Sequence, residues 1–262
     1  MTTGSPVLQI RSLRRHFGGL AAVDAFDLEV GEGEIVSLVG PNGAGKTTVF
    51  NLISGVLKPT EGSIRLLGRE LVGVPPHRIT HFGIARTFQN IRVFPQLTVR
   101  ENILLGTHHW TNSGMLGAVT FWPPTRRAER AAHAEVDRAI ALFQERLGPR
   151  LDDPAFSLSY ANRRRTEIAR ALAARPKLLL LDEPAAGMNP YERVEIAGLI
   201  RSMRDQGLTI LLIEHHMPLV MEISDRVVVM DHGVKIAEGL PKEVHSNPRV
   251  IEAYLGRRAA TA

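Results

Sequence analysis

The feature that most constrains the fold of this 262-residue chain is a glycine-rich segment, Gly40-Pro41-Asn42-Gly43-Ala44-Gly45-Lys46-Thr47. It follows the run Ile35-Val36-Ser37-Leu38-Val39, which is apolar except for Ser37 and predicts a buried strand. Glycine lets successive backbone N–H groups turn inward without a Cβ clash, and a helix beginning near Lys46 adds its positive N-terminal end. This strand, loop and helix fit the P-loop pattern, a cradle for phosphate groups. The alternative is a tight glycine turn that binds no nucleotide.

Two side chains of the segment carry specific chemistry. Lys46 can reach the β- and γ-phosphates of a nucleoside triphosphate and offset their charge, and the Thr47 hydroxyl can ligate Mg²⁺. The predicted nucleotide-binding set from this region comprises Gly40, Pro41, Asn42, Gly43, Ala44, Gly45, Lys46, Thr47 and Thr48.

An acidic pair follows a second apolar run, Leu178–Leu181. A buried strand that delivers Asp182 at its C-terminal end matches a Walker B element, where the carboxylate holds Mg²⁺ through water. Glu183 would then lie at the edge of the sheet, placed to orient or deprotonate an attacking water. The alternative, a strand ending in two solvated carboxylates, is weakened by the presence of a P-loop in the same chain.

The apolar pattern predicts an α/β core interrupted by a helical block. Short apolar runs punctuated by glycine and proline occur in residues 1–88 and 173–256, and they indicate a parallel sheet covered on both faces. Residues 89–172 are mainly helical in pattern, and residues 257–262 form a tail. One helical stripe consists of Val136, Ile140, Phe143 and Leu147.

Composition excludes several classes of protein. The chain has no cysteine, which rules out a disulfide framework and any cysteine-ligated metal. No apolar run reaches the roughly 18 to 20 residues that span a bilayer. Residues 1–9 lack the basic flank and apolar region of a signal peptide, so we expect the chain to act in the cytosol. A net charge of +5 permits attraction to nucleic acid, anionic lipid or an acidic partner, and distinguishes none of them.

Together these motifs resemble the ATPase subunits of the ABC family, with matches over nearly the whole chain. The resemblance implies a P-loop α/β core with N-terminal antiparallel strands and an inserted helical subdomain. Phe17 stands where the family has an aromatic that stacks on adenine, a core phenylalanine being the alternative. Gln89 matches the glutamine that links the metal site to the helical subdomain, a polar hinge residue being the alternative. His215 matches the switch histidine that contacts the γ-phosphate.

The family signature, usually Leu-Ser-Gly-Gly-Gln, is altered to Leu158-Ser159-Tyr160-Ala161-Asn162. The resemblance implies that Ser159 and Ala161 approach ATP held by the opposite subunit of a dimer. We expect the methyl group of Ala161 to obstruct that approach and to disfavour any positive φ, which would weaken one composite site. The arginines at 163–165 would partly compensate by adding positive charge near the anion.

Four segments resemble more narrowly the ATPases of branched-chain amino acid importers; they comprise residues 17–23, 85–90, 97–102 and 184–190. The long segment 106–130, which contains both tryptophans, resembles the longer of the two paired ATPases of these importers. The resemblance implies ATP and Mg²⁺ as cofactors and a location on the cytoplasmic face of the cell membrane. It implies transmembrane permease subunits and a second ATPase subunit as partners, a solute-binding protein acting through the permease, and no nucleic acid.

Two alternative functions stay open at this point. An ABC-type ATPase that acts on DNA or ribosomes would be expected to show a long coiled coil, zinc-binding cysteines or two cassettes, and the sequence shows none of these. A regulatory ATP-binding module that does not hydrolyse ATP is supported only by the altered signature. The intact residues Lys46, Asp182, Glu183 and His215 argue against it.

Overall fold

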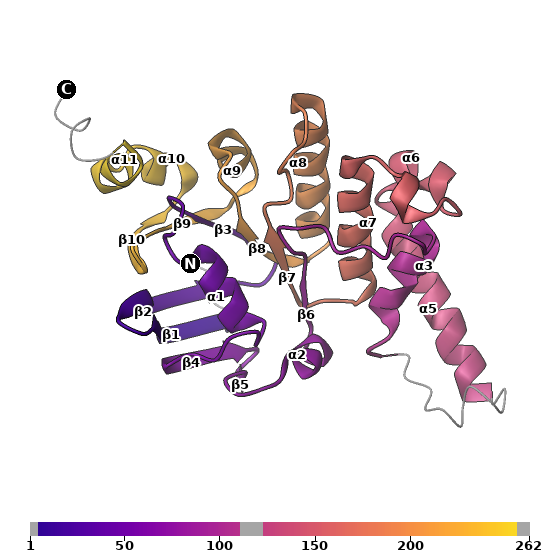
Figure 1. The fold of residues 1–262 in the computed structure, drawn as a ribbon, viewed down its shortest axis with the longest axis horizontal. Coiled ribbons are helices and arrows are strands. Elements are labelled where there is room, and N and C mark those ends of the chain that lie inside the picture. The colour runs from indigo at the N-terminus through magenta and orange to yellow at the C-terminus, as the bar shows by residue number, and fades with distance from the viewer. Residues whose placement is uncertain (1–4, 111–122, 256–262) are drawn as a thin grey trace.

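The computed structural model describes residues 5–110 and 123–255, which form two β-sheets and a cluster of helices at one end (Figure 1). The N-terminal sheet is antiparallel, in the order β2-β1-β4-β5. Its strands are β1 (Leu8–Phe17), β2 (Leu20–Val30), β4 (Glu61–Leu66) and β5 (Arg69–Glu70). The antiparallel strands expected near the N-terminus are therefore confirmed.

The second sheet carries the strands predicted from continuous apolar runs. Its order is β10-β9-β3-β8-β7-β6, parallel from β9 to β6 with β10 antiparallel at the edge. The strands are β3 (Ile35–Val39), β6 (Ile84–Arg86), β7 (Leu178–Asp182), β8 (Thr209–Ile213), β9 (Arg226–Asp231) and β10 (Val234–Gly239). Every residue of β3, β7 and β8 is buried, because both faces of the sheet are covered.

Alternate side chains of β7 enter two different apolar clusters. Leu178 and Leu180 pack in the cluster that contains α1 (Lys46–Ile53) and the N-terminal sheet. Leu179 and Leu181 pack in the cluster that contains α7 (Tyr160–Ala173) and α8 (Pro190–Asp205). The helices associated with the core are α1 (Lys46–Ile53), α2 (Pro76–Phe82), α8 (Pro190–Asp205), α9 (Met217–Ile223), α10 (Pro241–His245) and α11 (Pro248–Leu255).

One of these helices is not indicated by the sequence pattern. Helix α2 lies in a region whose runs are strand-like, and its seven residues are too few to display an apolar stripe. Ile79 is its one buried residue, Pro76 occupies its first turn, and Gly83 ends it with a φ of 105°.

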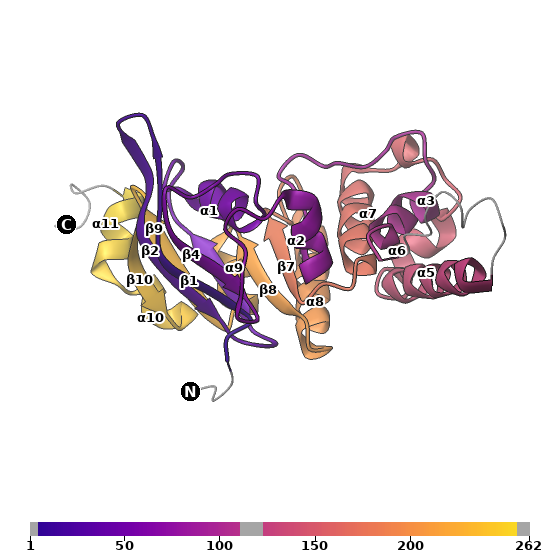
Figure 2. The same ribbon diagram turned by 90° about the horizontal axis from the view of Figure 1, so that it is seen from below.

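The helices between β6 and β7 form one end of the molecule in both views (Figures 1 and 2). They are α3 (Val99–Leu104), α5 (Pro123–Ala141), α6 (Gln144–Leu147) and α7 (Tyr160–Ala173), with 3₁₀ turns at Leu105–Thr107, Gly148–Arg150 and Ala155–Ser157. The predicted stripe is buried here at Val136, Ile140, Phe143 and Leu147.

The segment that contains both tryptophans is only partly described. The indole N–H of Trp110 donates to the carbonyl of Ala173 at 3.3 Å, and Arg175 lies 4.3 Å above the indole ring. Trp110 therefore packs against the C-terminal end of α7. Trp122 and the tail at residues 257–262 lie outside the described residues. Among the described helices, none is long and apolar enough to cross a membrane.

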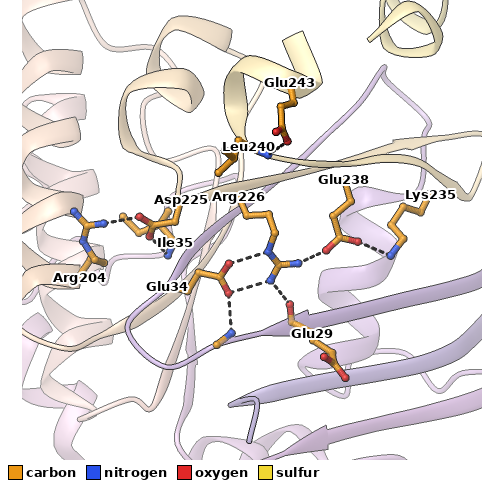
Figure 3. Close-up of polar contacts among 11 residues, drawn as sticks. Glu29, Glu34, Ile35, Arg204, Asp225, Arg226, Lys235, Glu238, Leu240 and Glu243 are labelled. Carbon is orange, nitrogen blue, oxygen red and sulfur yellow. Dashed lines mark hydrogen bonds and ion pairs between the residues drawn. The ribbon is translucent and has the colours of Figure 1, made fainter. Parts of the chain in front are cut away.

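A charged network joins the β9–β10 hairpin to the N-terminal part of the chain (Figure 3). Arg226 donates to both carboxylate oxygens of Glu34, at 2.8 and 3.0 Å, and to the carbonyl of Glu29. It also pairs with Glu238, which in turn accepts from Lys235 at 2.6 Å. Since each charge faces an opposite one, this network attaches β9 firmly beside β3, the strand that leads into the P-loop.

Candidate active site

The glycine-rich segment forms the predicted strand–loop–helix unit. The chain leaves β3 at Gly40, and α1 begins at Lys46, directly after Gly45. Gly40 has a φ of 149° and Gly45 a φ of 102°. A Cβ at Gly40 would collide with the carbonyl of Met230, and one at Gly45 with the carbonyl of Ala22. Glycine is therefore required at both positions by the close approach of neighbouring backbone.

Lys46 is held at the opening of this loop. Its Nζ donates to the carbonyls of Gly40 at 2.7 Å and Pro41 at 2.8 Å, and the residue is buried. Burial lowers the pKa of Lys46, while the carboxylates of Glu183 and Asp182 act in the opposite direction. The ammonium group therefore lies between the loop and the acidic end of β7, where it can face phosphate oxygens.

A cavity of about 460 Å³ brings several predicted residues together. It is lined by Phe17, Leu20, Ala21, Ala22, Asn42, Gly43, Ala44, Gly45, Lys46, Thr47, Thr48, Gln89, Glu183 and His232. The Phe17 side chain is 44% exposed, and the guanidinium of Arg15 lies 4.6 Å from the centre of its ring. Phe17 is therefore no core phenylalanine, and its ring can face a ligand in the cavity.

Three catalytic candidates meet where β7 and β8 end. Asp182 is the buried last residue of β7, and the N–H of Glu183 donates to the carbonyl of Ile213 at 2.9 Å. The Gln89 side-chain amide donates to Glu183 Oε2 at 3.3 Å, and His215 Nδ1 lies 3.8 Å from Glu183 Oε1. Carboxyl ends of adjacent parallel strands share one sheet edge, so residues distant in sequence converge there.

Arg86 is a site residue that sequence reasoning did not identify. Its guanidinium pairs with Asp182 at 3.1 Å and also donates to the side chains of Asn51 at 2.8 Å and Ser54 at 2.9 Å, both in or next to α1. Burial raises the pKa of Asp182, and the hydrogen bond and charge of Arg86 oppose that rise. Arg86 therefore orients the acid relative to the helix that follows the P-loop. Its one sequence signal is its position three residues before Gln89.

The altered signature begins α7 and lies outside the cavity described above. The Ser159 side chain caps the helix by accepting the N–H of Asn162 at 3.3 Å. Ala161 is helical, without a positive φ, and its residue is 3% exposed within an apolar cluster. The methyl group therefore packs into the protein's own core, and the weakening of a composite site shared with a second subunit stays a prediction.

The arginines that follow Asn162 have partners within the chain, and their effect on an anion held by a second subunit stays a prediction. Arg163 donates to the carbonyls of Leu158 at 3.0 Å and Phe156 at 2.7 Å. Arg165 donates to the Glu195 carboxylate at 2.6 Å, which joins α7 to α8. The guanidinium of Arg163 thus binds the loop before α7, and that of Arg165 binds the neighbouring helix α8.

Arg164 connects the signature helix to the Gln89 segment. It is fully buried and donates to the carbonyls of Phe88 and Gln89 and to Glu167 at 2.9 Å. The second oxygen of Glu167 accepts the N–H of Arg92 at 3.1 Å. The buried ion pair thus also binds the backbone of one loop, and it joins that loop to the start of α7.

Comparison with known proteins gives the family. Residues 23–186 match the family model described as "ABC transporter". The chain belongs to the ABC transporter family. Residues 234–260 also match the model described as "Branched-chain amino acid ATP-binding cassette transporter". As a member of the family, this ABC ATPase binds ATP and couples its hydrolysis to transport.

Similar proteins cover nearly the whole chain. The high-affinity branched-chain amino acid transport ATP-binding protein LivG of Salmonella typhimurium is 48% identical, over 96% of this ABC ATPase and 98% of the relative. BraF of Pseudomonas aeruginosa, which bears the same description, is 45% identical with the same coverage. LivG of Escherichia coli K12 is 46% identical over 96% and 98%.

Solved structures show the same fold. The ADP conformation of MJ1267, an ATP-binding cassette of an ABC transporter, superposes with a TM-score of 0.83 at 31% identity, over 97% of this chain and all of the other. A nucleotide-free ATP-binding cassette from an ABC transporter superposes with a TM-score of 0.82 at 30% identity, over 96% of this chain and all of the other. The predicted P-loop fold of ABC ATPase type is confirmed.

Proposed function

We propose that this ABC ATPase powers the uptake of branched-chain amino acids or related small solutes. Support comes from the 45–48% identity to LivG and BraF over nearly all of each chain. The match of residues 234–260 to a branched-chain amino acid transporter model adds to it. Because these relatives are transport proteins, the alternative of an ABC ATPase that acts on nucleic acid or ribosomes has no support.

The observation that carries the proposed catalytic roles is the convergence of Gln89 and His215 on the Glu183 carboxylate, at 3.3 and 3.8 Å. Glu183 would accept the proton of a water that attacks the γ-phosphorus in line with the leaving oxygen. His215 would contact the γ-phosphate and Gln89 would position the water. Lys46 would offset the phosphate charge, so catalysis is mainly positioning and charge neutralisation.

The residues also fit ATP with Mg²⁺. Thr47, Asp182 and Gln89 offer a hydroxyl, a carboxylate and an amide oxygen, the hard oxygen donors that this cation prefers. Mg²⁺ held there would offset the charge of the phosphate groups. Phe17 would stack on the adenine. Residues 40–48 would surround the phosphates with backbone N–H groups.

We further propose that two such ATPases pack head to tail, as an identical or a mixed pair, so that Ser159 of one faces the ATP of the other. Ala161, whose side chain is buried, would take part only through its backbone N–H. Residues 89–172 would act as the subdomain that responds to nucleotide, and residues 90–97 would contact transmembrane permease subunits. Phe94 in this segment is 54% exposed, which makes it available for such contact. The complex would lie on the cytoplasmic face of the membrane and receive solute through a binding protein on the other side.

The catalytic assignment is tested by Glu183→Gln in the assembled transporter. We expect ATP and Mg²⁺ binding to persist while turnover slows by at least ~100-fold, since general-base assistance is lost. Dimers should accumulate because bound ATP is not consumed. ATP turnover, equilibrium ATP binding and size-exclusion chromatography check these outcomes.

A contrasting variant separates chemistry from binding. Lys46→Ala removes a charge directed at the phosphates, so ATP binding itself should weaken strongly while the fold survives. Near-normal turnover in Glu183→Gln would remove Glu183 from its role. Absence of turnover in the unmodified complex would favour a regulatory ATP-binding module.

A further inference from the structure

The backbone of Glu183 has an unusual conformation. Its φ is 49°, in the left-handed region that residues with a Cβ rarely occupy. Such a conformation is strained and persists only where surrounding contacts enforce it. Two backbone bonds contribute: Glu183 N–H donates to Ile213, and its carbonyl accepts the N–H of Ala186 at 3.1 Å.

A third constraint comes from Glu214, which follows β8 and immediately precedes His215. The residue is 1% exposed. Its Oε1 accepts the N–H of Ala185 at 3.1 Å, on the loop that follows Glu183. Its Oε2 accepts the N–H groups of His215 at 3.0 Å and His216 at 3.2 Å. One carboxylate thus holds the backbones of two loops that each carry a catalytic candidate.

We propose that Glu214 is a positioning residue for ATP hydrolysis, fixing the loop of Glu183 and the loop of His215 in one mutual geometry. This inference rests on the roles proposed above for Glu183 and His215. Glu214 acts through the backbone amides that it binds, and its Oε2 also lies 4.0 Å from His215 Nδ1.

The chemistry of the contact explains why a carboxylate is needed. Three N–H groups from two directions converge on one buried side chain, and both ionised carboxylate oxygens accept without donating. These bonds offset the cost of burying the charge. A glutamine at this position keeps one acceptor oxygen, but its NH₂ group would face a backbone N–H on the other side and could not accept a hydrogen bond from it. An aspartate keeps both oxygens but is one methylene shorter.

A purely structural carboxylate would show a different pattern of effects. Loss of a structural contact lowers the free energy of unfolding and reduces the active fraction, without separating binding from chemistry. A positioning residue instead lowers kcat while ATP binding is preserved. Its effect also disappears when the group through which it acts has already been removed, because such groups are not additive.

The test uses Glu214→Gln in the complete transporter complex. We expect kcat to fall ~10- to 100-fold, the scale of a misplaced catalytic group, while the Kd for ATP changes by less than about threefold. In a complex that already carries Glu183→Gln, the addition of Glu214→Gln should reduce the residual turnover by less than about twofold. Glu214→Asp should recover part of kcat.

The matched control is Glu135→Gln. Glu135 is also a buried carboxylate, paired with Arg138 and Arg175 at 2.6 and 2.7 Å in the helical end of the molecule. We expect the kcat per folded complex of Glu135→Gln to stay near that of the unmodified complex. A full kcat in Glu214→Gln, a parallel loss of kcat and ATP affinity, or an additive loss with Glu183→Gln would overturn the proposal.

If Glu214→Gln does not fold, Glu214→Asp decides, and an unchanged kcat in that variant overturns the proposal. Normal turnover in Glu183→Gln alone would instead contradict the function proposed for the site.

Discussion

The exposure of Phe17 decides between two roles for this residue, contact with a ligand and packing in the core. Its ring is 44% exposed in the cavity that contains the P-loop. Phe17→Ala should weaken ATP binding ~5- to 150-fold, from about 1–3 kcal/mol for a base stacked on an aromatic ring. Inorganic triphosphate, which offers no ring, should lose far less affinity. Calorimetric titration with each ligand checks this.

The control for this variant is Phe156→Ala, since Phe156 is 54% exposed and lies outside that cavity. It should bind both ligands as the unmodified chain does. Equal losses for ATP and triphosphate in Phe17→Ala would show that the ring does not stack on adenine.

Some site residues could be predicted from sequence because their chemistry lies in a local pattern. Lys46 and Asp182 belong to such patterns, in which a strand and a loop fix the role of the side chain. Arg86 and Glu214 could not, since each acts through partners that only the folded sheet brings near. The burial of Arg164 could not be predicted either, because the carbonyls that bind it belong to a loop about 75 residues earlier in the chain.

Helix α7 and the loop that carries Gln89 are joined by the buried Arg164–Glu167 pair. Arg164→Leu leaves the Glu167 carboxylate buried without this partner, and Arg170 at 4.0 Å replaces it only in part. We expect a loss of about 3–5 kcal/mol in the free energy of unfolding. Denaturant unfolding measures the loss.

The neighbouring Arg163→Leu provides the comparison for α7. Arg163 donates to two backbone carbonyls and pairs with no carboxylate among the described residues, so its loss should cost about 1.5–3 kcal/mol. If Arg164→Leu destabilises the chain no more than Arg163→Leu, the buried pair does not hold these two elements together.

Strands and helices differed in how well the sequence indicated them. The runs at β3, β7 and β8 are apolar on both faces of the strand, apart from Ser37, Asp182 and Thr209, because both sheet faces are buried. The stripe through Val136 was equally clear. The sequence pattern did not indicate helix α2 because the helix is short and buries one residue against the core.

At the scale of the whole molecule, the position of the helices α3 to α7 relative to the core follows from where β6 and β7 lie. They are neighbours in the sheet, yet the helices α3 to α7 leave and return between them. These helices therefore project to one side of the core (Figure 2). The pattern of residues predicted their existence, but the ion pairs that set their position join residues far apart in sequence and leave no local signal.

Transport by the complete complex tests the central claim most directly. The chain, with the permease subunits and partner ATPase that co-purify with it, would be reconstituted into liposomes with ATP on the side of the ATPases and a solute-binding protein on the other. We expect radiolabelled leucine to accumulate with ATP, and accumulation to cease in complexes that carry Glu183→Gln. ATP turnover without accumulation of leucine, isoleucine or valine would contradict the proposed function.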